Sequence, residues 1–170
     1  MEVQAIGMRP QRIEPGPGQE SVWDYPRPPR LEPSTDVLLV RMGEHTIAET
    51  NRSLRILETS QPPAFYIPEA DVDMDALTPS LGRSFCEWKG EASYYDLSTD
   101  STTLDQVAWR YQDPTAPFAE IVGHLAFYAQ KLTCSVNGEE VTANAGSFYA
   151  GWITSSVVGP FKGGLGTGFW

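Results

Sequence analysis

The stretch that decides the fold class covers residues 84–112 and reads SFCEWKGEASYYDLSTDSTTLDQVAWRYQ. Its two outer parts, 84–97 and 104–112, are rich in aromatic and other apolar residues, and the part between them, STDSTT, is polar. Aromatic and β-branched residues favour strands, and a short polar segment between two such runs predicts a hairpin. The stretch therefore predicts two antiparallel strands.

The same texture continues on both sides of this hairpin. DVLLVRM (36–42) turns at Gly43 into HTIAET (45–50), and SLRILET (53–59) follows as a third strand. The pair Asn137-Gly138 is the strongest short hairpin signal in the chain. AFYIP (64–68) is a brief extended piece, EADVDMDALTPS (69–80) is a turn of helix or an acidic loop, and Pro117 allows one short helix to follow. We expect a mainly β fold of two small antiparallel sheets, with at most one or two short helices.

Both ends of the chain differ from this pattern. Residues 1–35 contain seven of the fourteen prolines, which predicts an extended arm in front of a single domain over 36–170. Either Trp23 and Tyr25 pin this arm onto the domain, or the arm docks onto a partner or a second copy of the chain. The last 25 residues hold seven of the fifteen glycines, which predicts a tail over the sheets anchored by Phe148, Tyr149, Trp152, Phe161 and Trp170.

Composition and charge narrow the classes of function. A chain of 170 residues with 41% hydrophobic residues is long enough for one real core. Its 12 basic and 22 acidic residues give a net charge of −10, which disfavours neutralisation of nucleic-acid phosphates. There is no apolar run of about 18 residues and no signal-peptide core at the start. We expect a soluble cytoplasmic protein without a nucleic-acid or membrane partner.

Motifs for metals and phosphates are incomplete. The chain has two cysteines and two histidines and no C-x-x-C pair, which argues against a zinc site. Asp71, Asp73 and Asp75 alternate as in the paired aspartates of nucleotidyltransferases, but no Gly-Ser pair lies shortly upstream, so a solvated acidic loop is the other interpretation. The glycines of FKGGLGTGF (161–169) lack the Walker spacing. No metal ligand is predicted, and the cofactor is left open.

The segment around Lys89 is the best candidate site. In a regular strand Cys86 and Trp88 face one side, and Glu87, Lys89 and Glu91 face the other. A nucleophilic cysteine needs a cationic or imidazole neighbour, and only a bulge at Gly90 would bring Lys89 beside the thiol. Without the bulge, the lysine face is the site and the cysteine is packing.

Several motifs together resemble a known family. They are LET-x-x-PP (57–63), Cys-x-x-Lys-Gly (86–90) and Gly-His-x-Ala-Phe-Tyr (123–128). Over roughly 36–170 the chain resembles the domain of unknown function 427, a family labelled nucleotidyltransferase-like. The resemblance implies a small β-tent-like fold in which two sheets meet at an angle. The four zinc-binding cysteines of many β-tent proteins are absent. The family pattern falls on Arg55, Glu58, Tyr66, Cys86, Lys89, Gly90, Tyr94, Trp109, Tyr111, His124, Phe127 and Tyr128.

Two hypotheses for the function follow. In the first, a concave pocket binds a small polar or anionic ligand through Arg55, Glu58, Tyr66, Trp88, Lys89, Tyr94, Trp109, Tyr111 and Tyr128. In the second, the chain is an enzyme: Cys86 or Glu91 acts on a substrate with His124 as proton shuttle, or the aspartate run holds a metal for phosphoryl or nucleotidyl transfer. A homo-oligomer formed through the N-terminal arm is a further alternative.

Overall fold

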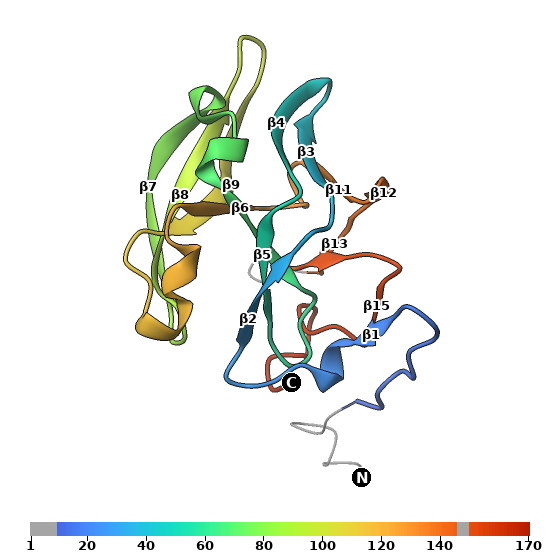
Figure 1. The fold of residues 1–170 in the computed structure, drawn as a ribbon. Helices are drawn as coiled ribbons and strands as arrows, with labels where there is room; N and C mark the ends of the chain where they lie inside the picture. The colour runs from blue at the N-terminus through green and yellow to red at the C-terminus, as the bar shows by residue number, and fades with distance from the viewer. Residues whose placement is uncertain (1–9, 146–149) are drawn as a thin grey trace.

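The computed structural model describes residues 10–145 and 150–170, and it confirms a mainly β fold (Figure 1). Its largest sheet has seven strands, and all neighbouring strands in it are antiparallel. In spatial order they are β2 (Arg30–Ser34), β5 (Ser53–Leu57), β6 (Ala64–Pro68), β10 (His124–Phe127), β9 (Thr103–Tyr111), β8 (Gly90–Ser98) and β7 (Leu77–Cys86).

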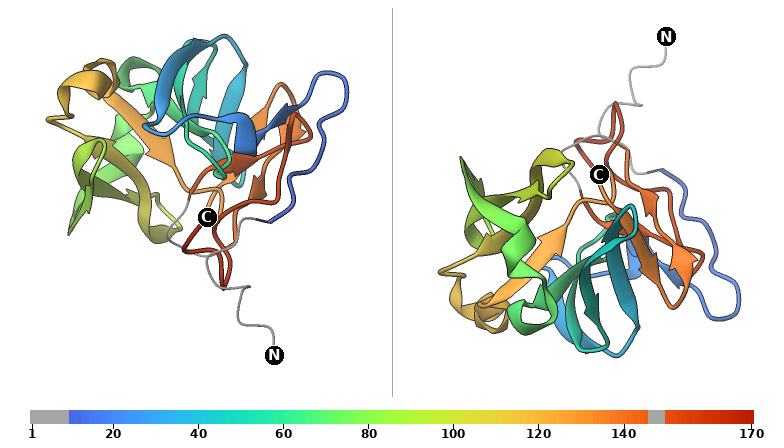
Figure 2. Two further views of the ribbon diagram at one scale, coloured as in Figure 1. Left: turned by 90° about the horizontal axis from the view of Figure 1, so that it is seen from below. Right: turned by 90° about the horizontal axis from the view of Figure 1, so that it is seen from above.

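A second antiparallel sheet has four strands, in the order β12 (Glu139–Glu140), β11 (Thr133–Val136), β3 (Leu38–Met42) and β4 (His45–Thr50). It lies beside the large sheet in both views of Figure 2. The described residues also form two small two-stranded sheets. In one, β1 (Glu20–Ser21) runs parallel to β15 (Val157–Val158), and in the other, β13 (Thr142–Ala143) is antiparallel to β14 (Trp152–Ile153). The helical segments are 3-10 turns, namely η1 (Val22–Asp24), η2 (Glu69–Asp71), η3 (Met74–Ala76) and η4 (Ala116–Ile121). None of the described helices is long and apolar enough to cross a membrane.

The seven-stranded sheet is apolar on both faces. In β6, Phe65 and Ile67 belong to the core between the two large sheets, whereas Tyr66 belongs to a second cluster on the opposite face. In β9, Ala108 and Trp109 divide in the same way. Successive side chains of a strand point to opposite faces, so this alternation gives one sheet two buried layers. The second layer forms the floor of the candidate site described below.

Three predicted hairpins are confirmed and one stretch is corrected. Strands β3 and β4 pair, and β8 pairs with β9 across the polar turn. Strand β11 pairs with β12 around Asn137 and Gly138, whose φ angles of 50° and 84° suit that tight turn. The stretch 84–97 is not one strand: β7 ends at Cys86, three residues form a turn, and β8 begins at Gly90. Strand β7 also starts at Leu77, where a helical turn or loop was predicted.

The arm predicted for residues 1–35 packs on its own chain wherever the structure describes it. Strand β2 joins the large sheet beside β5, and Val22 and Tyr25 are buried against Leu57 and Val157. The predicted tail anchors behave similarly: Trp152 lies in the main core, Phe161 packs beside Val22, and the Trp170 ring lies 5.8 Å from that of Trp23. Phe148 and Tyr149 lie outside the described residues. Dimerisation through the arm stays a prediction.

Candidate functional site

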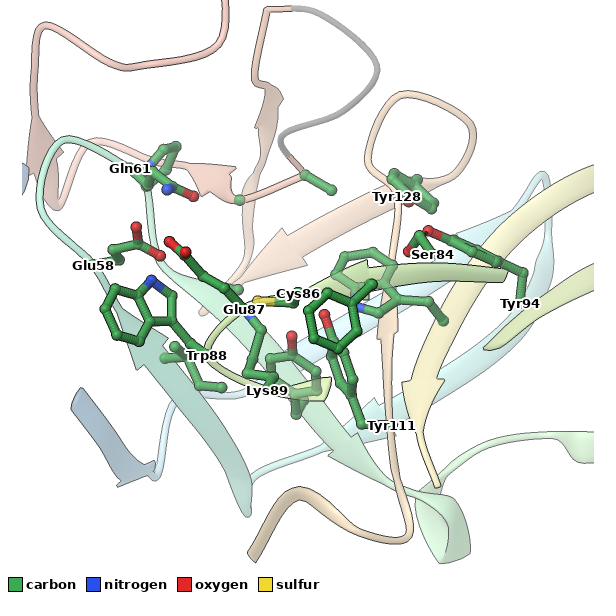
Figure 3. Close-up of a pocket in the computed structure, with 18 of the residues that line it drawn as sticks. Glu58, Gln61, Ser84, Cys86, Glu87, Trp88, Lys89, Tyr94, Tyr111 and Tyr128 are labelled. Atoms are coloured by element: carbon green, nitrogen blue, oxygen red, sulfur yellow. Dashed lines mark hydrogen bonds between the residues drawn. The ribbon is translucent and has the colours of Figure 1, made fainter. Parts of the chain in front are cut away.

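A pocket of about 600 Å³, here called the aromatic pocket, lies on the second apolar face of the seven-stranded sheet (Figure 3). The lining residues come from the end of β5 through β6, from β7, the β7–β8 turn and β8, from β9, from the segment after β10, and from the segments before β14 and after β15. Its residues are Ile56, Glu58, Gln61, Pro62, Ala64, Tyr66, Ser84, Phe85, Cys86, Glu87, Trp88, Lys89, Tyr94, Gln106, Trp109, Tyr111, Tyr128, Ala150, Gly151 and Lys162. A volume in this range suits a small organic ligand.

The floor of the aromatic pocket is a layer of aromatic rings in edge-to-face and tilted contact. Tyr66 meets Trp109 edge to face with their centroids 6.2 Å apart, and Trp109 lies 4.6 Å from Tyr128. The Tyr111 ring lies 6.4 Å from that of Tyr66. Such contacts fix each ring through its neighbours. The pocket therefore presents a preformed apolar surface with hydroxyl groups along it.

The β7–β8 turn carries two of the charged residues that line the pocket, Glu87 and Lys89. Glu87, Trp88 and Lys89 form the turn, and Cys86 pairs with Gly90 across it. Gly90 has a φ of 108°, which a residue with a side chain rarely adopts. Thr115 clamps the turn from outside, because its hydroxyl donates to the Trp88 carbonyl at 2.5 Å and its N–H donates to the Lys89 carbonyl at 3.0 Å. Two hydrogen bonds from Thr115 thus hold the turn in one geometry.

Lys89 is partly buried, and its side chain points toward Cys86 in Figure 3. Its Nζ lies 5.7 Å from the centroid of the Tyr111 ring, which is cation–π distance. Burial lowers the pKa of Lys89, but Tyr66, Cys86 and Glu58 raise it, and the net direction is upward. The Cys86 thiol lines the same pocket as this ammonium. Lys89 is therefore a charged group inside an aromatic site.

The tyrosines supply neutral hydroxyl groups. Burial raises the pKa of Tyr111, and the neighbouring Tyr66 and Cys86 raise it further. Burial and the adjacent Tyr94 also raise the pKa of Tyr128. Tyr94 in turn shares a hydrogen bond of 2.6 Å with Ser84. The pocket thus has one end with Cys86, Lys89 and carboxylates, and another end of uncharged hydroxyls.

Comparison with known families identifies the chain. The family model described as "Domain of unknown function (DUF427)" matches residues 30–138. The chain belongs to this family. Comparison with curated proteins gave no match.

The matched segment of this DUF427 domain contains the β5–β6 wall, the β7–β8 turn, β9 and Tyr128. Three lining residues, Ala150, Gly151 and Lys162, lie beyond it. The family description assigns no activity, so the chemistry has to be argued from the pocket.

The pocket brings together all but three of the site residues predicted from the sequence. Those that line it are Cys86 and the ligand-binding candidates Glu58, Tyr66, Trp88, Lys89, Tyr94, Trp109, Tyr111 and Tyr128. Because the β7–β8 turn interrupts the predicted strand, Cys86 and Lys89 reach the same pocket and do not lie on opposite faces. Sequence reasoning missed Gln61, Ser84, Gln106 and Lys162, and no local pattern marks them.

His124, Glu91 and Arg55 lie outside the pocket lining. His124 begins β10, and its Nδ1 lies 3.1 Å from the Val122 carbonyl oxygen. Glu91 is exposed and faces Arg83 at 3.8 Å. Neither His124 nor Glu91 therefore lines the pocket with Cys86. The positively charged residue that lines it on the same turn is Lys89.

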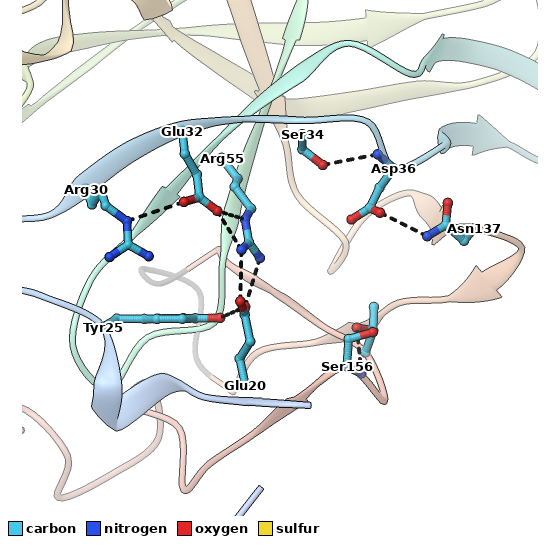
Figure 4. Close-up of polar contacts among 10 residues, drawn as sticks. Glu20, Tyr25, Arg30, Glu32, Ser34, Asp36, Arg55, Asn137 and Ser156 are labelled. Atoms are coloured by element: carbon cyan, nitrogen blue, oxygen red, sulfur yellow. Dashed lines mark hydrogen bonds and ion pairs between the residues drawn. The ribbon is translucent and has the colours of Figure 1, made fainter. Parts of the chain in front are cut away.

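Arg55 is the centre of a charged cluster on the arm side of the sheet (Figure 4). Its Nη1 and Nη2 donate to the two oxygens of Glu20 at 3.0 and 3.1 Å, and its Nε donates to Glu32 at 2.7 Å. The Tyr25 hydroxyl donates to Glu20 at 2.8 Å. Arg55 thus binds the N-terminal segment to β5. The carboxylate of Glu58 likewise faces the N-terminal segment, where Arg27 lies 3.4 Å away.

The aspartates of the acidic run turn to separate partners. Asp71 accepts hydrogen bonds from Arg52 and Thr50, which lower its pKa to about 2. Asp73 lies 2.9 Å from His45. Within residues 10–145 and 150–170, no group of three or more His, Cys, Asp or Glu side chains is placed to hold a metal ion. The acidic run gives no support to metal-dependent transfer in this part of the chain.

Proposed function

We propose that this DUF427 domain binds a small monoanionic ligand with a flat ring in the aromatic pocket. The observation that carries the proposal is the charged Lys89 side chain inside a pocket of about 600 Å³ whose floor is Tyr66, Tyr111, Trp109 and Tyr128. A buried or half-buried charge favours a partner of opposite sign, and ring surfaces favour a flat apolar group. A ligand with both features satisfies both parts of the pocket.

The charge of the chain restricts the ligand further. The net charge of −10 repels multiply charged anions over a long range, which disfavours nucleoside triphosphates. Inside the pocket, Glu58 and Glu87 stand close to the Lys89 end (Figure 3). A single carboxylate on the ligand matches Lys89, whereas additional charges would face these carboxylates. The neutral tyrosine hydroxyls at the other end suit uncharged polar groups.

The test uses benzoate as a probe and the fluorescence of Trp88 and Trp109, which both line the pocket. We expect saturable quenching and a rise in melting temperature for the native chain. Lys89→Met should weaken benzoate binding about 10- to 100-fold, the range for a hydrogen bond to a charged group. Arg83→Met is the matched control, because this substitution removes a positive charge from the same hairpin at a residue that does not line the pocket. Equal affinities of both variants would refute the role of Lys89.

A further inference from the structure

The pocket contains a nucleophile that ligand binding does not use. Cys86 lines it as the last residue of β7, and the Lys89 side chain points toward it from the adjoining turn (Figure 3). A thiol reacts as its thiolate, and a neighbouring cation stabilises that anion. The fold brings Cys86 and Lys89 together, because Lys89 lies in the turn that joins β7 to β8 and Cys86 is the last residue before that turn.

The other cysteine shows how different this environment is. Cys134 is buried in β11, its Sγ donates to the Leu132 carbonyl at 3.9 Å, and it does not line the pocket. Burial raises the pKa of the Cys134 thiol to about 12. Cys134 is thus a packed apolar side chain. Only one of the two thiols faces a cation and a space large enough for a ligand.

The groups around Cys86 also suit the charge that develops when a thiolate attacks a carbonyl group. Lys89, Tyr66 and Tyr111 line the pocket together with the thiol. The Tyr111 ring centroid lies 5.7 Å from the Lys89 Nζ and 6.4 Å from the Tyr66 ring centroid. Their ammonium and hydroxyl groups are hydrogen-bond donors, and donors directed at a developing oxyanion stabilise it. An attack that develops no negative charge on oxygen would gain nothing from this arrangement. The electrophile that matches the site is therefore a carbonyl carbon.

The lining residues favour an aldehyde over an ester as the electrophile. Attack on an ester expels an alcohol and leaves an acyl group on sulfur, and its removal needs a base that activates water. None of the described lining residues is a histidine, and His124 lies outside the pocket. Addition to an aldehyde has no leaving group and needs no such base.

Resting on the proposed function, we infer that Cys86 adds reversibly to the carbonyl carbon of a small aromatic aldehyde, whose oxygen takes the place beside Lys89 that the carboxylate takes in the proposed function. The thiol first gives its proton to water. The sulfur–carbon bond then forms, the carbon–oxygen π bond breaks, and the oxygen takes a proton from the Lys89 ammonium, which water protonates again. The product is a hemithioacetal, and neither an oxidant nor a further reactant is required. Lys89 stabilises the thiolate before the step and the oxyanion after it.

The experiment uses benzaldehyde labelled with ¹³C at its aldehyde carbon, and benzoate as the probe that cannot react. With the native chain, we expect the labelled signal to move from the carbonyl region to the saturated region, with one equivalent bound. Cys86→Ser should lose this signal and still bind benzoate, whereas Cys134→Ser should keep it. Lys89→Met should lower the affinity for benzaldehyde at least about tenfold.

The outcomes separate the two proposals. Normal benzoate binding without a saturated-carbon signal in the native chain would overturn the covalent step alone. A signal that persists in Cys86→Ser and is trapped by borohydride would assign the adduct to Lys89 and also overturn it. If benzoate does not bind, the proposed function fails and the covalent inference fails with it.

Discussion

Replacing Arg55 by methionine tests whether this residue is a structural anchor or a ligand-binding group. The substitution keeps an unbranched apolar side chain and removes the guanidinium group that joins Glu20 and Glu32. Both carboxylates then lose their charged partner, while the aromatic pocket on another part of the chain keeps its lining. We expect a clear loss of stability and unchanged benzoate affinity.

The size of the loss follows from the exposure of the cluster. The Arg55 side chain is 18% exposed, and those of Glu32 and Glu20 are 30% and 46% exposed. Exposed ion pairs contribute about 0–1 kcal/mol, and breaking a fully buried pair costs about 3–5 kcal/mol. An intermediate cluster with two carboxylates should cost about 2 kcal/mol. For a chain of this length, that corresponds to a fall in melting temperature of about 4–8 °C.

The assay is urea unfolding of Arg55→Met beside Arg83→Met, whose side chain is 50% exposed and lies 3.8 Å from that of Glu91. The control should lose less than about 0.5 kcal/mol. The hydrogen bond from Arg55 lowers the pKa of Glu20 below its ordinary 4.5. A lowered folded-state pKa stabilises the fold above pH 4.5, and that stabilisation disappears as the pH falls through the folded-state value. The deficit of Arg55→Met should therefore shrink in acid. A loss no larger than that of Arg83→Met, or weakened benzoate binding, would refute the anchoring role.

Two further substitutions test the core and the turn. Burial holds the Cys134 pKa at about 12 against an ordinary 9.0, so only the unfolded thiol ionises just above pH 9. The free energy of unfolding of the native chain should therefore fall by about 1.4 kcal/mol per pH unit above pH 9. Cys134→Ala should lack this part of the slope, and identical slopes of the two proteins between pH 9 and 10 would contradict the prediction. Gly90→Ala should destabilise the chain by about 1–3 kcal/mol, since its φ is 108° and the added Cβ would lie 3.4 Å from the Asp113 carbonyl oxygen. Gly168→Ala, with open space around its Cβ, is the control and should change little on the same denaturant curves.

The hairpins could be predicted because their turn residues carry a local signal. Asn137 and Gly138 adopt positive φ angles that few other residue types accept, so their sequence marks the turn. The flanking apolar runs predict the strands on either side. Strand β7 carries no such signal. It is an edge strand that contains Pro79, and Leu81 on it is fully exposed, so neither composition nor alternation marks it as a strand. Because the sequence does not mark where β7 begins, it predicts strand through the residues that form the β7–β8 turn.

The site was partly predictable for a related reason. Aromatic residues such as Trp109 and Tyr111 alternate along β9, and that period places them on one face. The role of Arg55 was not predictable, because its partners come from the proline-rich arm, which shows no strand pattern of its own. The contributions of Gly151 and Lys162 depend on how the tail returns to the sheet, which is a long-range property of the fold.

The pairing of β1 with β15 has a consequence for how the chain is made. Trp23, just after β1, donates from Nε1 to the Pro160 carbonyl, 137 residues further along. Ribosomes add about 5–20 residues per second, so the first segment waits on the order of ten seconds for its partner. During that time Val22, which is fully buried in the finished protein, has no β15 to pack on. The nascent chain therefore passes through an interval in which this segment is open to chaperones and proteases that the completed fold excludes.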